Sequence, residues 1–274
     1  MNYIRKSLLT LIFSSLIFIA SGQKNADSLF KPHAYLYFSG YVPEITTSIR
    51  FDSKTAHIGT VVSLENSLNF DENPKLWRAD GYIRAGKRSA FALTFLSINR
   101  NRSWTLERDL KFRDTTFTTG ANAKMYFNTN YWGLSYRYSI FSKPTWSAGL
   151  SFGLRILTVK TGITAESKLF GSYSSNSQLV VPAALVGFHG AAYLWKRLQF
   201  RYTWEFLRLN VEGIKIYVFD NNFALEYFIL KNVGLGASYS EVSYRINEIP
   251  FSEEFSGQIE YTVSGFSLFL AARF

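Results

Sequence analysis

The stretch WSAGLSFGLRI, residues 146–156, decides the fold class of this chain. Apolar side chains, most of them large, alternate one for one with small polar, glycine or charged residues along it. The first set is Trp146, Ala148, Leu150, Phe152, Leu154 and Ile156, and the second is Ser147, Gly149, Ser151, Gly153 and Arg155. A period of two residues indicates a β-strand whose two faces meet different surroundings.

The composition of the second face indicates which surroundings these are. In a soluble β-sandwich this face would meet water and carry long polar side chains. Glycine and serine instead dominate it, and small residues weaken a water-facing strand. They suit the inside of a closed barrel, where side chains compete for room. We therefore expect a β-barrel whose apolar face contacts lipid.

The same alternation recurs along the chain, including residues 131–141, 198–206 and 233–239. It continues to the last residue in GFSLFLAARF, residues 265–274. The nearly apolar segment 179–195 resembles a membrane helix, but it is short for one and contains a proline and two glycines. We expect it to be a strand as well.

Counting these segments predicts an all-β, closed antiparallel transmembrane barrel of about twelve strands, with ten to fourteen compatible with the pattern. The expected strands are 57–66, 76–86, 89–100, 103–112, 116–127, 131–141, 146–162, 178–195, 198–211, 214–230, 233–246 and 258–274. The stretch 34–51 adds one or two strands, or replaces a weak one within 103–127. Short connections on one side (84–89, 141–146, 194–199, 230–234) and long ones on the other (166–178, 247–258) are typical of outer-membrane barrels.

Residues 1–22 have the pattern of a cleaved secretory signal peptide. Arg5 and Lys6 precede an apolar stretch, and small residues at 20 and 22 precede Gln23. No cysteine follows, so a lipoprotein anchor is excluded. We expect export, cleavage before Gln23, and one barrel domain over residues 23–274.

Bulk properties narrow the remaining function classes. The 274 residues include no cysteine, which excludes disulfides and thiolate metal sites. The net charge is +10, and loss of Arg5 and Lys6 leaves +8. In an exported chain we expect this charge to meet anionic lipid headgroups or the lumen, not nucleic acid.

Together, the leader, the two-residue repeat, the turn asymmetry and the ending GFSLFLAARF resemble Gram-negative outer-membrane β-barrel proteins. The resemblance implies a location in the outer membrane, contact with its lipids and lipopolysaccharide, and delivery by the barrel-assembly machinery. It also implies that the terminal apolar residues form an assembly signal. These residues are Phe266, Leu268, Leu270 and Phe274.

Few residues stand out as chemically reactive. His33, His57 and His189 have no metal-ligand spacing, and we expect no metal, cofactor or catalytic residue. Predicted inward charges are the stronger signal, either as a hydrogen-bonded plug or as the charged lining of a pore. They are Arg137, Arg155, Arg201, Glu205, Glu226, Glu260 and Arg273.

Three functions remain compatible with the sequence. The preferred one is a non-enzymatic, porin-like narrow channel or a structural and interaction protein. The second is a barrel-embedded hydrolase acting on lipid or peptide, with His189 as general base. The third is a barrel subunit of a secretion or surface-assembly complex. The sequence leaves the solute, the partners and the oligomeric state open.

Overall fold

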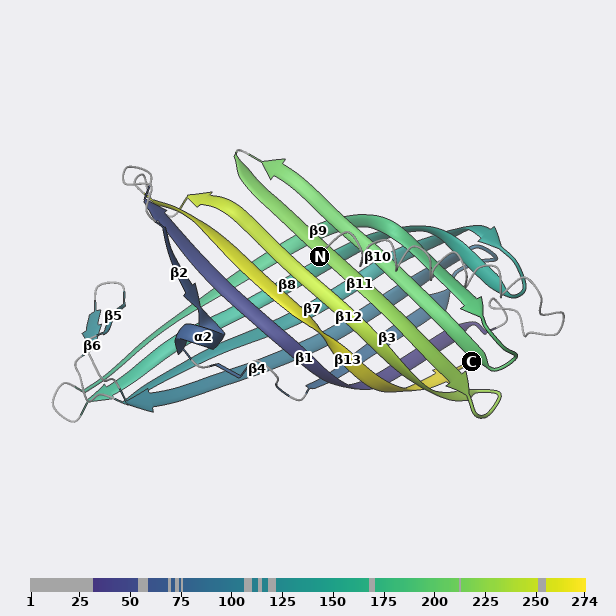
Figure 1. Ribbon diagram of the computed structural model, residues 1–274, viewed down its shortest axis with the longest axis horizontal. Coiled ribbons are helices and arrows are strands. Elements are labelled where there is room, and N and C mark those ends of the chain that lie inside the picture. The colour runs from purple at the N-terminus through teal and green to yellow at the C-terminus, as the bar shows by residue number, and fades with distance from the viewer. Residues whose placement is uncertain are drawn as a thin grey trace, which may run out of the picture.

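The computed structural model describes residues 32–53, 59–68, 70, 71, 74, 76–105, 110–112, 115–117, 122–167, 171–211, 213–250 and 255–274. Over these residues, ten antiparallel strands close into a tilted barrel (Figure 1). The barrel strands are β1 (Ala34–Ser53), β3 (Leu76–Arg84), β4 (Ser89–Thr105), β7 (Asn122–Ser142), β8 (Trp146–Ser167), β9 (Gly171–Tyr193), β10 (Leu198–Val211), β11 (Ile214–Phe228), β12 (Val233–Pro250) and β13 (Phe255–Arg273). Pairing of β13 with β1 closes the sheet, from Tyr35 opposite Arg273 to Ser53 opposite Phe255.

Four short elements lie outside the ring of barrel strands. Strand β2 (Gly59–Ser63) pairs only with β1 among the described residues, and helix α2 (Leu64–Leu68) follows it directly. Strands β5 (Leu110–Phe112) and β6 (Thr115–Phe117) form a separate hairpin sheet. All four belong to connections at the long-loop end of the barrel (Figure 1).

The prediction of about twelve strands is wrong, although ten lies within the compatible range. The described residues of segment 57–66 belong to β2 and α2, and those of segments 103–112 and 116–127 divide among β4, β5, β6 and β7. The stretch 34–51, which the list of twelve strands did not include, forms the barrel strand β1. The error has a physical cause. The outward positions of β4 and β7 change from apolar to asparagine partway along each strand, as at Asn99, Asn101, Asn128 and Asn130, so the alternation fades while the strand continues.

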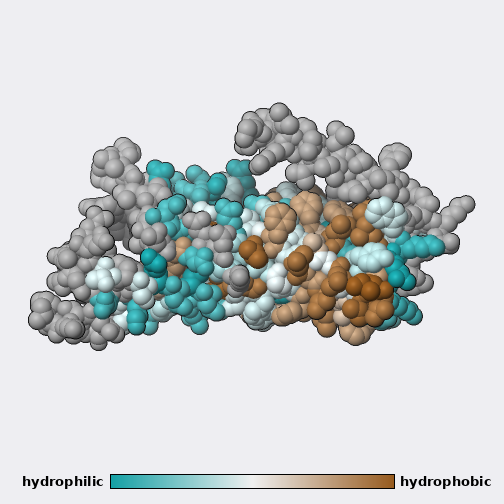
Figure 2. Space-filling view, turned by 60° about the horizontal axis from the view of Figure 1, so that its bottom comes forward, coloured by the Kyte–Doolittle hydropathy of each residue, from teal (hydrophilic) through white to brown (hydrophobic). Residues whose placement is uncertain are grey.

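The assignment of faces is confirmed. On β8, Leu150 and Leu154 are exposed, whereas Ser151 and Arg155 are buried in the barrel. The nearly apolar segment 179–195 is the strand β9, with Val186 and Phe188 outward. Exposed apolar side chains gather over the end of the barrel that holds the C-terminus and the short turns (Figure 2). This apolar belt is the surface that lipid would cover.

The other half of the barrel presents a polar outer surface (Figure 2). The outward face of each long strand changes from apolar to polar as the strand leaves the apolar belt. Exposed outward residues there include Glu44, Lys124, Lys160, Gln178, Arg208 and Arg245. Strands of 20 to 23 residues, such as β1 and β9, exceed the 9–11 residues that a tilted strand needs to cross a bilayer. The sheet therefore continues beyond the membrane into water.

None of the helices in the described part of the chain has the length and apolar character to cross a membrane. The predicted signal peptide, residues 1–22, and its cleavage position lie outside the described residues.

The boundary of the apolar belt can be tested on one face of one strand. Leu150→Arg places a charge in the middle of the belt, where it should cost about 2–4 kcal/mol of folding free energy near the bilayer midplane. Thr164→Arg lies on the same outward face of β8 but in the polar half, so its cost should be close to zero. Unfolding of both variants in lipid vesicles measures the difference. Equal costs would place the belt elsewhere.

Candidate functional site

The barrel interior is the candidate site, and its centre is an arginine held by two acids. Arg155 Nε donates to Asp220 Oδ2 at 2.7 Å, and its Nη2 pairs with Glu205 Oε2. Tyr131 donates its hydroxyl to Asp220 at 2.5 Å, and Ser151 donates to Glu205. All these side chains come from β7, β8, β10 and β11. Every charge in this cluster is thus both paired and hydrogen-bonded, as burial requires.

Glycines make room for this cluster. A Cβ at Gly153 would lie 2.5 Å from Glu205 Oε2, and one at Gly133 would lie 3.2 Å from the Arg155 side chain. The small residues that the sequence places on the inner face therefore hold space for the large charged residues opposite them. The same cross-section continues in Arg78, whose Nε donates to Asp80 at 2.9 Å, while Thr94 donates to Asp80 at 2.7 Å.

On the long-loop side of the charged cluster, the interior is apolar. Buried side chains from facing strands pack together here inside the barrel, and we call this set the apolar plug. Its members include Tyr41, Ile45, Leu96, Leu157, Leu185, Val218, Tyr244 and Val263. Leu64 of α2 and Phe70 pack against it from the long-loop connection after β2. The apolar plug therefore brings together buried side chains from strands on opposite sides of the barrel.

Helix α2 is held by a buried ion pair. Glu65 accepts from Arg100 Nη1 of β4 at 2.6 Å and from the backbone amide of Thr47 at 2.8 Å. Arg100 Nη2 donates to the Thr47 hydroxyl at 2.9 Å, and the guanidinium lies 5.0 Å from the centre of the Phe127 ring. The long connection between β1 and β3 is therefore fastened inside the barrel mouth.

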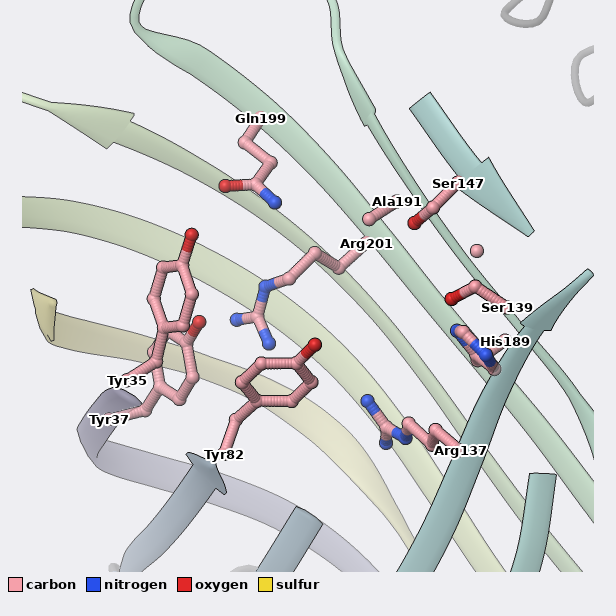
Figure 3. Close-up of a pocket in the computed structure, with 11 residues that line it drawn as sticks. Tyr35, Tyr37, Tyr82, Arg137, Ser139, Ser147, His189, Ala191, Gln199 and Arg201 are labelled. Carbon is pink, nitrogen blue, oxygen red and sulfur yellow. The ribbon is translucent and has the colours of Figure 1, made fainter. Parts of the chain in front are cut away.

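On the short-turn side of the charged cluster lies a small cavity lined by arginine, tyrosine and histidine (Figure 3). Its volume is about 50 Å³, room for a few water molecules. Arg201 pairs with Glu226 at 3.4 Å, and its guanidinium lies 3.9 Å from the centre of the Tyr37 ring. Nearer the end of the barrel, Arg273 donates to the Tyr193 hydroxyl at 3.0 Å and lies over the Phe228 ring.

Six of the seven predicted inward charges point into the barrel, and the structure distributes them over its length. Glu205 and Arg155 meet in the central cluster, Arg201 and Glu226 meet beside the cavity, Arg137 lines that cavity, and Arg273 lies near the short turns. Whether they act as a plug or as a pore lining stays a prediction.

The prediction that Glu260 points into the barrel is wrong. Glu260 lies on the same face of β13 as Phe266 and Leu268, and it pairs with Arg245 of β12 at 2.5 Å on the outside of the barrel. The two-residue period runs unbroken from the exposed Phe266 back to Glu260, so an even position on this strand cannot be inward. Glu260 is a polar outer-surface residue beyond the apolar belt.

Sequence reasoning missed Arg78, Arg100, Asp220 and Glu65 inside the barrel. For Asp220 the signal was available, because it is six residues from Glu226 on one strand and therefore on the same face. Arg100 was missed because it stands where the outward alternation of β4 fades. Glu65 belongs to a helix within a predicted strand, and no two-residue period could place it.

The remaining predicted residues are placed as follows. Phe266, Leu268, Leu270 and Phe274 are all outward and exposed, in the apolar belt. His189 points into the barrel and lines the small cavity, and His33 lies near the short turns and contacts Arg84. His57 lies outside the described residues. Within the described ranges, no three histidine, cysteine or acidic side chains are grouped as a metal site.

Comparison with known proteins concerns the fold alone. No protein-family model matches this chain, and no curated protein matches it either. Among solved structures, the outer-membrane protease OmpT of Escherichia coli matches with a TM-score of 0.57 at 10% identity, over 92% of this chain and 99% of OmpT. OprG of Pseudomonas aeruginosa matches with a TM-score of 0.32 at 7% identity, over 91% of this chain and 98% of OprG. The match to OmpT confirms the resemblance to Gram-negative outer-membrane β-barrels at the level of the fold.

A comparison of two ion pairs tests how much the central cluster contributes to the folding free energy. Arg155→Met leaves Glu205 and Asp220 buried without their cation, and we expect a loss of about 3–5 kcal/mol of folding free energy. Arg245→Met removes the exposed pair with Glu260, and it should cost about 0–1 kcal/mol. Denaturant unfolding of both refolded variants gives the two values. Similar losses would mean that the cluster is hydrated rather than buried.

Proposed function

We propose that this protein is a non-enzymatic, integral outer-membrane barrel that is closed to solutes and acts as a structural and interaction protein. One observation carries the proposal: side chains fill the interior. The apolar plug, the Arg155 cluster and the Glu65–Arg100 pair follow one another along the lumen. A narrow barrel filled in this way holds its strands in register but offers no wide pore.

The polar outer half supports the interaction role. It extends the sheet beyond the apolar belt (Figure 2), and β2, α2, β5 and β6 lie at the same end (Figure 1). Charged side chains of both signs, such as Glu44, Lys124 and Arg208, lie exposed there. We propose that lipopolysaccharide and other outer-membrane lipids surround the apolar belt, and that partners meet the polar outer half. Such a partner could be another subunit of a secretion or surface-assembly complex, and its identity is left open.

The hydrolase alternative has less support. OmpT is named as a protease, but a likeness at 10% identity concerns the fold. His189 shares its cavity with Ser139 and Ser147, yet the described residues that line it include no carboxylate to orient the imidazole. A cavity of about 50 Å³ also has no room for a lipid or peptide substrate.

Conductance in planar bilayers tests the closed state. Refolded protein, shown to be inserted by protection of its belt from protease, should give no stable single-channel current. A Tyr41→Ala/Tyr244→Ala variant thins the apolar plug and should raise ion leakage, because both side chains are almost completely buried in it. Steady conductance of the unchanged protein would overturn the proposal and favour a channel.

We also propose that the exposed apolar ending of β13 is read by the barrel-assembly machinery. Phe274 is 63% exposed, so it contributes less to stability than a fully buried side chain, whose burial is worth roughly 1.5–3 kcal/mol. Leu230, in the turn between β11 and β12, is also 63% exposed. The two residues therefore form a matched pair at the same end of the barrel.

Deleting Phe274 should reduce assembly in cells severalfold and leave refolding in detergent nearly unchanged, because recognition needs the anchor and barrel closure does not. Leu230→Ala should alter neither. Heat-modifiable mobility of membrane fractions and of refolded protein reports both steps. Normal cellular assembly of the truncated chain would exclude a targeting role for Phe274.

A further inference from the structure

The cavity on the short-turn side of the charged cluster is lined by an arginine, Arg137, that forms no ion pair with the acids of that cluster. Arg137 points into the space between Tyr82, His189 and Arg201 (Figure 3). Within the described residues, its guanidinium has no carboxylate within 4.0 Å, and its buried Nε has no hydrogen-bond partner. Arg201, in contrast, pairs with Glu226 and lies over Tyr37.

The carboxylates near Arg137 are committed elsewhere. Glu205 is engaged by Arg155, Ser135 and Ser151, and Glu226 pairs with Arg201 at 3.4 Å. Asp80 and Asp220 line the adjoining cavity together with Arg137, but they are held by Arg78 and Arg155. The side chains described as lining the cavity include two arginines and no acid. Four further polar atoms there also lack a hydrogen-bond partner among the described residues: the Tyr35 hydroxyl, His189 Nε2, Arg201 Nε and Gln199 Oε1. The cavity is thus rich in hydrogen-bond donors and positively charged.

We propose that this cavity binds one oxyanion group, a phosphate or a carboxylate, between Arg137 and Arg201. A guanidinium presents a planar fork of donors that matches such a group. The volume of about 50 Å³ fits a single small group, not a sugar or a nucleotide. The short turns are the nearer end of the barrel, so we expect the anion to enter from that end, past the buried Arg273 and Tyr193 side chains, as a free ion or as the end of a larger molecule. That this end faces the periplasm rests on the proposed outer-membrane role, whereas binding itself does not.

Titration calorimetry of the refolded barrel at low salt tests the proposal, with inorganic phosphate and acetate as probes. Wild-type protein should bind at least one of them saturably, and Arg137→Gln should weaken that binding at least tenfold. The matched control is Arg88→Gln, an exposed arginine in the turn between β3 and β4, which should bind like wild type. Glycerol 3-phosphate distinguishes the sources: binding indicates an end group of a larger molecule, and exclusion indicates a free ion.

A second variant keeps the test decisive if Arg137→Gln does not fold. Ser147→Leu fills the cavity but retains both arginines, and it should also abolish binding. No saturable binding to wild-type protein would mean that water alone fills the cavity, and the proposal would be wrong. The proposal would also be wrong if folded Arg137→Gln bound the anion with wild-type affinity. If Arg137→Gln does not fold, wild-type affinity of Ser147→Leu would contradict the proposal instead. A conducting barrel that binds phosphate would overturn the proposed function but not this site.

Discussion

The pairing of β1 with β13 is the constraint on which the rest of the structure depends. Nineteen residue pairs, from Tyr35–Arg273 to Ser53–Phe255, join the two ends of the described sheet. Closure satisfies the backbone groups that an open edge would leave unpaired in lipid. It also sets a narrow interior, because the diameter grows with the number of strands. Everything inside must then fit the space that ten strands leave.

The contents of that space follow from its size and from the cost of buried charge. Glycines at 133 and 153 give up side-chain volume so that Arg155 can reach Glu205 and Asp220 across the lumen. Such ion pairs add little net stability over an apolar filling, but breaking one is costly. The charged cluster therefore favours the register in which each partner is present. The apolar plug fills the adjoining cross-section by packing alone.

The sequence predicted the fold class, the outward face of β8 and the strand nature of β9, because lipid and lumen impose opposite side chains on alternate positions. It did not predict the strand number, because Asn99 and Asn128 interrupt the apolar alternation where β4 and β7 enter water. The two-residue period could place Arg155 and Glu205 inside, but it could not show that they meet. Contacts between β8 and β10 depend on barrel curvature, which a one-dimensional pattern does not contain. Glu260 was misplaced although the period of its own strand indicated the outer face.

The long strands have a consequence for reach. Strand β9 has 23 residues, and at about 3.3 Å per residue and a tilt of about 45° it rises roughly 50 Å along the barrel axis. An apolar band of about 25 Å accounts for only half of that height. The remainder is polar sheet that extends beyond the lipid headgroups and carries the strand ends of that half. A large molecule that never touches the bilayer can therefore reach them.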